Sequence, residues 1–309
     1  MQSPSFCILT VGYTKQWGFT VSILFWRLLV ISLGEKLILN KAQDLAKQSV
    51  ENWRQWQAPF QSQPKIVRQL EGGLTNTNYL IEAGSQRAVL RINNPQADKL
   101  GVNRQAEITI LKKLQSTDFV PRFYFADNSI LVTEYIDGCP LDAETALQPD
   151  IKKQIEQTIK AIQSIKMNDF DVRRYHSYLR EYCNQLSPRD LDESLRQALF
   201  QIARNIDNQD WSPVLCHHDL IPENIIQSAK GLFIIDWEYA SLGHPKFDFL
   251  RIFSHVEASE KLTSSSSKQL HAFQVVMDQL WYAIRYPEKQ QSILQKLTKI
   301  IEKVRLKNE

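Results

Sequence analysis

The sequence predicts an α+β fold with two lobes, a small lobe built on an antiparallel sheet and a larger, mainly helical lobe. Short apolar runs broken by polar turns fill residues 64–137, which is typical of strands joined in hairpins. Apolar residues then recur at helical spacing in residues 151–165 and 191–206. A short β insert within the second lobe, residues 216–248, carries a group of regularly spaced polar residues. The expected divisions are an apolar extension (1–36), a first lobe (37–137) and a second lobe (138–309).

Composition places the chain among ordinary globular proteins. It has 309 residues, of which 43% are hydrophobic and 23% charged, enough for a large core in two lobes. The net charge of +3 is too small to indicate a nucleic-acid-binding surface. The four cysteines, Cys7, Cys139, Cys183 and Cys216, lie far apart without CxxC spacing. We therefore expect reduced thiols in a cytoplasmic protein.

Residues 19–33 form a strongly apolar run. It is about fifteen residues long and contains Arg27, whereas a membrane span needs roughly 20 predominantly apolar residues. No basic cluster precedes it and no small-residue cleavage site follows, which disfavours a signal peptide. We expect either an extra element packed on the first lobe or an over-extended start, with the protein beginning near Leu37. A membrane-tethered regulator is the less favoured alternative.

The first lobe is predicted to contain a helix and five strands, at residues 41–53 (helix), 65–70, 79–81, 88–92, 119–125 and 129–135.

A polar turn at residues 71–78 joins the first two strands. Adjacent glycines permit positive φ and a close backbone approach, and Thr and Asn side chains add hydrogen-bond donors. Gly72, Gly73, Thr75 and Asn76 are therefore candidates for contact with nucleotide phosphates. A hairpin turn without a ligand is the alternative, because such dipeptides are common in turns.

Arg91 lies in the third strand, and Glu107 lies in a helix predicted at residues 101–114. Each residue alone is typical of a solvated surface charge. A cation on a strand followed by a carboxylate on the next helix also suits a phosphate-binding pair, because the carboxylate can hold the cation in place. We expect Arg91 to reach nucleotide phosphates and Glu107 to pair with it.

The last strand of the first lobe ends at Asp137-Gly138, where we place the hinge between the lobes. An apolar slot with a few fixed polar groups is typical of a site for a planar base. Backbone groups at Glu134 and Ile136 are the candidates for binding an adenine edge.

The central stretch, residues 216–248, begins with His217-x-Asp219, followed by Asn224 and, after the apolar run 232–235, Asp236. These side chains sit on a loop, a hairpin and a strand end. We expect Asp219 to orient or accept the proton of an attacking hydroxyl, and Asn224 and Asp236 to hold Mg²⁺. Phosphoryl transfer needs in-line positioning and charge neutralisation more than covalent help, so this sparse set suffices.

The two histidines of this stretch receive different interpretations. His217 is expected to be buried and to hold the loop through hydrogen bonds, and His218 to point outward. A metal site built from residues 216–219 is disfavoured, because consecutive residues of an extended chain point to opposite sides.

The second lobe is predicted to contain helices at residues 151–165, 191–206, 247–253, 270–286 and 292–304, with an aromatic segment at 175–182 and a serine-rich loop at 264–267.

Residues 64–255 resemble the aminoglycoside phosphotransferase/choline kinase superfamily. The matching segments are GGLTNTNYLI, AVLRI, the helix with Glu107, LVTEYIDG, HHDLIPEN and IIDWEYASLGHPKFD. The resemblance implies a protein-kinase-like fold, ATP and Mg²⁺ as cofactors, and Asp219 as catalytic base. It also implies that Glu238 assists the metal or acceptor end and that Asp248 braces the catalytic loop. Arg91, usually Lys, and Gln163, where the family often shows LH, depart from its pattern.

The acceptor is expected to be a small cationic alcohol, because no activation loop follows Asp236 and a protein substrate is therefore disfavoured. The IDWEYA segment looks like the thiamine kinase and choline kinase branches, and the spacing of residues 217–240 looks most like small bacterial thiamine kinases, which makes thiamine the preferred acceptor. Choline or ethanolamine is the alternative, followed by an aminoglycoside. The last is disfavoured because residues 288–309 carry six Lys or Arg against three Glu.

Aromatic faces around a cationic nitrogen would form the acceptor pocket. The candidates are Trp237 and Tyr239, with Phe253, Trp281 and Tyr282 behind them, and ordinary core packing is the alternative for each. A nucleotide-binding pseudokinase is the non-enzymatic alternative. The intact Asp219, Asn224 and Asp236 argue against it. The sequence leaves the oligomeric state open.

Overall fold

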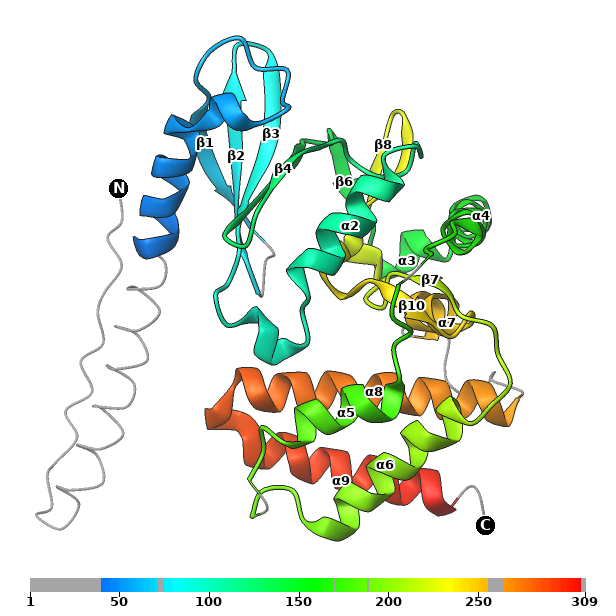
Figure 1. Ribbon diagram of the computed structural model, residues 1–309. Coiled ribbons are helices and arrows are strands. Elements are labelled where there is room, and N and C mark those ends of the chain that lie inside the picture. The colour runs from blue at the N-terminus through cyan, green and yellow to red at the C-terminus, as the bar shows by residue number, and fades with distance from the viewer. Residues whose placement is uncertain (1–39, 72–74, 169, 188, 255–263, 307–309) are drawn as a thin grey trace, which may run out of the picture.

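The computed structural model describes residues 40–71, 75–168, 170–187, 189–254 and 264–306, and it confirms the α+β fold class with a sheet lobe and a helical lobe (Figure 1). The apolar run at 19–33 lies outside the described residues. Within the described ranges, no helix combines the length and apolar character that crossing a membrane requires.

The first lobe is a five-stranded antiparallel sheet in the order β1-β2-β3-β5-β4. Its strands are β1 (Lys65–Leu70), β2 (Thr77–Ala83), β3 (Gln86–Ile92), β4 (Phe123–Ala126) and β5 (Ile130–Glu134). Residues 40–51 are helical, and this helix and the turn η1 (Trp53–Gln55) precede β1. Buried Ala46, Val50 and Trp56 join Ile81 and Leu90 of the sheet in one core. This packing gives the sheet one covered face.

Helix α2 (Arg104–Leu114) follows the turn η2 (Ala97–Leu100), and its N-terminus is capped by Asn103, whose side chain accepts from the Ala106 N–H at 3.0 Å. Its buried residues Ile110, Leu111 and Leu114 belong to the core of the second lobe. The helix therefore lies in the first lobe by sequence but attaches to the second lobe by packing, beside the catalytic segment (Figure 1).

A middle layer contains short strands and three helices. The elements are β6 (Gly138–Pro140), α3 (Ala143–Ala146), α4 (Pro149–Ser164), β7 (Val214–Cys216), η3 (Pro222–Asn224), β8 (Ile225–Ser228), β9 (Gly231–Ile234), η4 (Trp237–Tyr239), β10 (Ser241–Gly243) and α7 (Phe247–Ser254). The strands form two antiparallel sheets, β6-β8-β9 and β10-β7. The isoleucine stripe of α4 is buried beneath them, as its spacing predicts.

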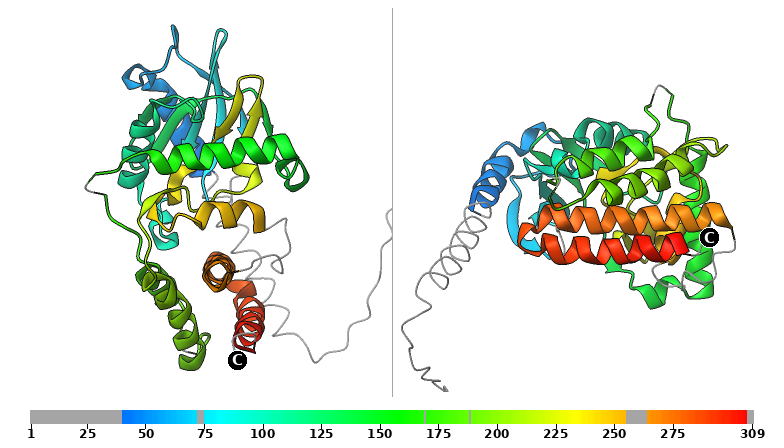
Figure 2. Two further views of the ribbon diagram at one scale, coloured as in Figure 1. Left: turned by 90° about the vertical axis from the view of Figure 1, so that its right-hand side faces the viewer. Right: turned by 90° about the horizontal axis from the view of Figure 1, so that it is seen from below.

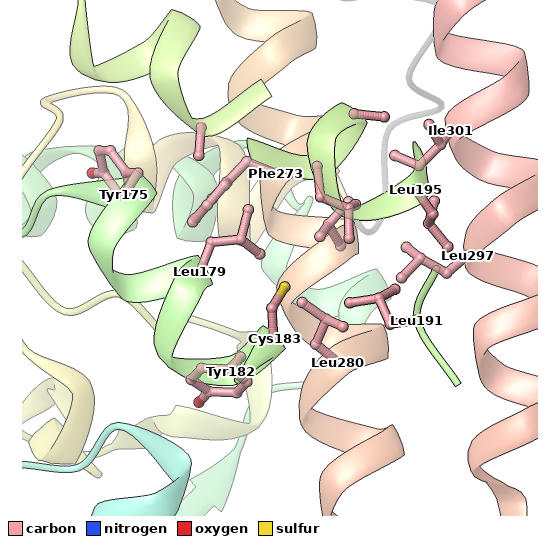
Figure 3. Packing of buried hydrophobic residues seen from close by; sticks show 14 of the residues in the cluster. Tyr175, Leu179, Tyr182, Cys183, Leu191, Leu195, Phe273, Leu280, Leu297 and Ile301 are labelled. Carbon is pink, nitrogen blue, oxygen red and sulfur yellow. The ribbon is translucent and has the colours of Figure 1, made fainter. Parts of the chain in front are cut away.

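A lower layer consists of α5 (Tyr175–Cys183), α6 (Glu193–Asp207), α8 (Ser265–Arg285), η6 (Pro287–Lys289) and α9 (Gln290–Leu306). The view from below shows α8 and α9 lying side by side (Figure 2). Leu191, Leu280 and Leu297 converge in its core, with Tyr175 and Phe273 at the other end (Figure 3). The second lobe thus has two cores, one per layer.

The serine-rich segment corrects one sequence prediction. Residues 264–267 were expected to form a loop, but Ser264 is the N-cap of α8 and its hydroxyl accepts from the Ser267 N–H at 3.1 Å. Serine is favoured at this position because its side chain satisfies a free N–H of the first turn. The helix therefore begins five residues before the predicted start at Leu270.

We predict that Leu199→Ala lowers the free energy of unfolding by about 2–5 kcal/mol, because Leu199 is fully buried in the lower core and the substitution leaves a cavity. Urea unfolding measures the change. Val67→Ala is the control, because Val67 is 46% exposed and its truncation should change stability by less than about 1 kcal/mol. Equal losses in the two variants would contradict the assigned core.

Candidate functional site

A cavity of about 900 Å³ is lined by residues of the sheet lobe and of both helical layers. It brings together most of the predicted site residues within the described ranges, although they come from separate elements, while His217 and Asp248 do not line it. Its lining includes Thr75, Asn76, Arg91, Glu107, Glu134, Ile136, Asp219, Asn224, Asp236, Trp237, Glu238 and Tyr239. Gly72 and Gly73 lie outside the described residues. The cavity is therefore the candidate active site.

The loop that follows β7 and carries Asp219 is held by Asp248, at the start of α7. Its carboxylate accepts from the backbone N–H groups of His217 at 2.7 Å and His218 at 3.0 Å. The buried His217 ring contacts the Ile235 carbonyl at 2.9 Å through Nε2, which ties the loop to the strand end that precedes Asp236. These contacts fix the position of the loop segment directly before Asp219.

His218 corrects a second prediction. It was expected to point outward, but its side chain is buried, with Nδ1 3.2 Å from the Ser241 hydroxyl and its ring against Phe247. Its φ is +64°, in the left-handed region, so the side-chain alternation of an extended strand does not apply. Burial lowers its pKa well below the ordinary value, which keeps the ring neutral.

Asn224 and Asp236 face the cavity from the two ends of one hairpin. Asn224 lies in η3, and its amide donates to the backbone carbonyl of Asp219 at 2.9 Å. The Ile235 N–H donates to the Asn224 carbonyl at 3.0 Å, which closes the hairpin. Asp236 takes φ +65° and ψ +57°, a conformation that non-glycine residues adopt rarely and often at functional sites. Its side chain remains 40% exposed to the cavity.

This pair fits a magnesium ion. Burial, and after it the charge of Glu238, raises the pKa of Asp236 well above its ordinary value, against the opposing charge of Arg91. Arg91 and Arg104 are here in contact with three carboxylates, those of Glu107, Asp236 and Glu238, so one negative charge is left over that a divalent cation would balance. In the described ranges no three His, Cys, Asp or Glu side chains are grouped to hold a metal. Mg²⁺ needs only one or two carboxylates beside waters and phosphates, so Asn224 and Asp236 suffice.

Arg91 and Glu107 form the expected pair, with 2.6 Å between Nη2 and Oε2 and both side chains buried. Nε of Arg91 donates to the Asn93 side chain at 3.0 Å, and Nη1 lies 3.5 Å from Asp236 Oδ1. Burial opposes ionisation of Glu107, but the charges of Arg91 and Arg104 lower its pKa overall. Arg91 is therefore a cation fixed beside Asp236.

Arg104 is a site residue that the sequence analysis missed. Its Nη1 donates to Glu107 at 2.9 Å and to Glu238 at 2.8 Å, and its Nη2 donates to the Asn76 side chain at 2.8 Å. The Asn76 amide donates to the same Glu238 oxygen at 2.7 Å. We call Asn76, Arg104, Glu107 and Glu238 the buried network.

The buried network places two predicted site residues in structural contacts, while their roles toward phosphates, metal and acceptor stay predictions. Asn76 was expected to contact phosphates, but its amide is committed to Glu238 and its oxygen to Arg104. Glu238 was expected to assist the metal or the acceptor, but it is buried and paired with Arg104 of α2. Both residues hold the polar turn of the first lobe against the catalytic segment.

The aromatic candidates separate into two roles. Trp237 is 1% exposed, its indole N–H donates to the Ile234 carbonyl at 3.0 Å, and its ring lies against His217. It therefore supports the loop from a buried position at the cavity wall, and its predicted role in the acceptor pocket stays a prediction. Tyr239 accepts from the Trp281 indole at 3.0 Å, and both line the cavity.

Two further residues missed by sequence reasoning flank Asp219. Arg251 of α7 donates to Asp219 Oδ1 at 2.9 Å through Nη2 and to Asp278 Oδ2 at 2.7 Å through Nη1. All three line the cavity. Arg251 and Asp278 lie on separate helices, so the sequence contained no spacing that linked them.

A family model described as choline/ethanolamine kinase matches residues 67–306. This chain belongs to the choline/ethanolamine kinase family. Protein LicA of Haemophilus influenzae is 25% identical over 220 residues, covering 62% of this chain and 58% of LicA. Ethanolamine kinase 2 of Mus musculus is 26% identical over 202 residues, covering 60% of this chain and 52% of the relative. The matched part is thus little more than half the length of either relative.

Solved structures show the same fold. Choline kinase LicA of Streptococcus pneumoniae aligns with a TM-score of 0.63 at 21% identity, over 84% of this chain and 98% of that chain. A spectinomycin phosphotransferase bound to ADP and spectinomycin aligns with a TM-score of 0.54 at 12% identity, over 83% and 96%. The expected superfamily is confirmed. Choline/ethanolamine kinase membership fits better than the thiamine kinase branch preferred above.

In this family member, Gln163 replaces the expected LH pattern and has a defined contact. Its side-chain amide donates to the Pro245 carbonyl at 2.6 Å. This bond links α4 to the segment that leads into α7, and so to Asp248. Gln163, which departs from the family pattern, therefore helps to support the loop that carries Asp219.

We predict a pH-dependent stability difference between the wild type and Asp248→Asn. Burial raises the pKa of Asp248 to about 6, from an ordinary value of 3.8. Between about pH 4 and 6 the folded chain therefore keeps a proton on Asp248 that the unfolded chain releases. The stabilisation from this buried carboxyl is full below about pH 4 and is lost as the pH rises through 6. The free energy of unfolding of the wild type minus that of the variant should fall by roughly 3 kcal/mol between pH 4 and 7.

Urea unfolding at several pH values measures this difference. Asp118→Asn is the matched control, because Asp118 is exposed and should show no such trend. A wild-type-minus-Asp248→Asn difference that stays constant, or rises with pH, would contradict the role given to the buried carboxyl.

Proposed function

We propose that this protein is an ATP-dependent kinase that transfers the γ-phosphate to the hydroxyl of choline or ethanolamine. The observation that carries the proposal is the convergence of Asp219, Asn224 and Asp236 on one cavity, opposite a buried Arg91 held by Glu107. Family membership supports a small alcohol as acceptor. A neighbour of known structure, LicA in complex with AMP, supports an adenine nucleotide as donor.

The chemistry assigned to the chain's own residues is positioning and charge balance. Asp219 orients the acceptor hydroxyl and accepts its proton as the oxygen bonds to the γ-phosphorus and the bond to the leaving ADP oxygen breaks. Arg91 offers its guanidinium to the phosphate oxygens. Mg²⁺ held by Asn224 and Asp236 would neutralise charge on those oxygens.

We expect the adenine to bind at the hinge between the two lobes. The N–H groups of Glu134 and Tyr135 already donate to the carbonyls of Arg122, at 2.8 Å, and Arg87, at 3.5 Å. The Ile136 amide is therefore the expected donor to the base. Val89 of β3 and Ile226 of β8 line the cavity from the two lobes and provide apolar contacts for its faces.

Choline and ethanolamine are preferred over thiamine as acceptors. The printed names of the relatives include ethanolamine kinases, and the solved neighbours include a choline kinase. All three candidates are cationic alcohols, so the aromatic wall of Tyr239 and Trp281 suits each of them. The relatives' names therefore support choline and ethanolamine ahead of thiamine, which is kept as a test substrate.

The test is ATP-dependent phosphorylation of choline, ethanolamine, thiamine and an aminoglycoside by the full chain. We expect turnover of choline or ethanolamine and a loss of kcat of about 10²–10⁴-fold in Asp219→Ala, because that variant lacks the proton acceptor. Asp118→Ala, which changes an exposed aspartate, is the control. Equal turnover in Asp219→Ala would disprove the mechanism, and turnover of thiamine alone would restore the first expectation for the acceptor.

A further inference from the structure

The segment that joins β3 to α2 reaches from the sheet lobe down to the lower layer (Figure 1). We call residues 97–102, which contain the turn η2, the strap. Leu100 and Val102 of the strap are buried, and Gly101 between them takes φ +75°, in the left-handed region that suits glycine. The chain that leads from the strand of Arg91 into α2 is therefore attached to a second part of the molecule.

The strap lies against helix α5 at a point where only glycine fits. A Cβ on Gly101 would stand 2.6 Å from Cε2 of Tyr178, so the strap backbone touches that ring and leaves no room for a side chain. Just beyond the end of α5, the Gln185 amide donates to the Lys99 carbonyl at 2.6 Å. Shape and hydrogen bonding thus agree on one seat for the strap.

The Tyr182 hydroxyl is the buried polar contact of this seat. Tyr182 is 1% exposed, and its hydroxyl donates to the Leu100 carbonyl. Burial raises the pKa of Tyr182 well above its ordinary value, so the hydroxyl keeps its proton and remains a donor. A buried carbonyl that loses its partner is unfavourable, so this bond favours the seated strap. The Tyr182 side chain also lines the cavity.

The strap ends where α2 begins, and α2 holds the cation at the phosphate end of the cavity. Only the N-cap residue separates the strap from Arg104, the first residue of the helix. Arg104 pairs with Glu107 and Glu238, and Glu107 also pairs with Arg91. A strap that left its seat would shift the start of α2, and with it the buried network that fixes Arg91.

We propose that Tyr182 is a positioning residue for Arg91, on which it acts through the strap and α2. The inference rests on the proposed function, because it takes the cavity to bind an adenine nucleotide with Mg²⁺. Tyr182 belongs to the lower layer, whereas Arg91 belongs to the sheet lobe. Only molecules with a seated strap present a fixed Arg91, so nucleotide affinity follows the fraction of molecules in that state.

The test compares ADP binding with choline binding in Tyr182→Phe. Calorimetry of the full chain, with ADP and Mg²⁺ or separately with choline, measures the two affinities independently of turnover. We expect the Kd for ADP to rise about tenfold, because loss of the hydroxyl lowers the seated fraction. The Kd for choline should change less than about threefold, because the aromatic ring remains. Tyr286→Phe is the matched control, because Tyr286 lies outside the cavity lining, and both affinities should stay unchanged.

Gly101→Ala tests the strap without altering Tyr182. The added methyl group meets the Tyr178 ring and strains the backbone at φ +75°, so the Kd for ADP should rise in this variant as well. An unchanged Kd for ADP in both variants would mark the seat as packing alone and overturn the proposal. A loss confined to choline would mark Tyr182 as an acceptor contact and also overturn it. A wild type that binds no ADP would remove the proposed function together with this inference.

Discussion

The buried network of Asn76, Arg104, Glu107 and Glu238 is the constraint on which the rest of the site depends. Charged groups removed from water are stable only when they are paired, and breaking such a pair is strongly destabilising. The members come from the polar turn, from α2 and from η4, so the sheet lobe and the catalytic segment must meet in one arrangement to satisfy them. That arrangement also places Arg91, through Glu107, next to Asp236.

A second set of paired charges surrounds Asp219. Asp219 lies on the loop that Asp248 holds through the His217 N–H. The Asp219 carboxylate also accepts from Arg251 of α7, which donates to Asp278 of α8 as well. The middle and lower layers therefore share a charged contact beside Asp219, as the upper and middle layers share one beside Asp236. Asp236, by contrast, has a raised pKa and a partly exposed carboxylate. A bound cation would balance the charge of this carboxylate, and nucleotide phosphates would provide further ligands to that cation.

Sequence reasoning reached the parts of the site whose geometry is local. Asp219, Asn224 and Asp236 belong to one loop and hairpin, so their spacing determines their convergence, and Arg91 and Glu107 follow from a strand and the next helix. Arg104 could not be found in this way, because its partner Glu238 lies 134 residues further along and an isolated arginine resembles a surface charge. Asp278 and Arg251 were missed for the same reason. His218 was misplaced because only the backbone shows its positive φ.

A double-mutant cycle on Arg104 and Glu238 tests the central claim most directly. Arg104→Met and Glu238→Met are each expected to lower the free energy of unfolding by about 3 kcal/mol, because each leaves a buried charge with one partner fewer. The account predicts that the double variant loses at least about 1.5 kcal/mol less than the sum of the single losses, as measured by urea unfolding. Losses that add to within about 0.5 kcal/mol would contradict the claim that this network joins the lobes.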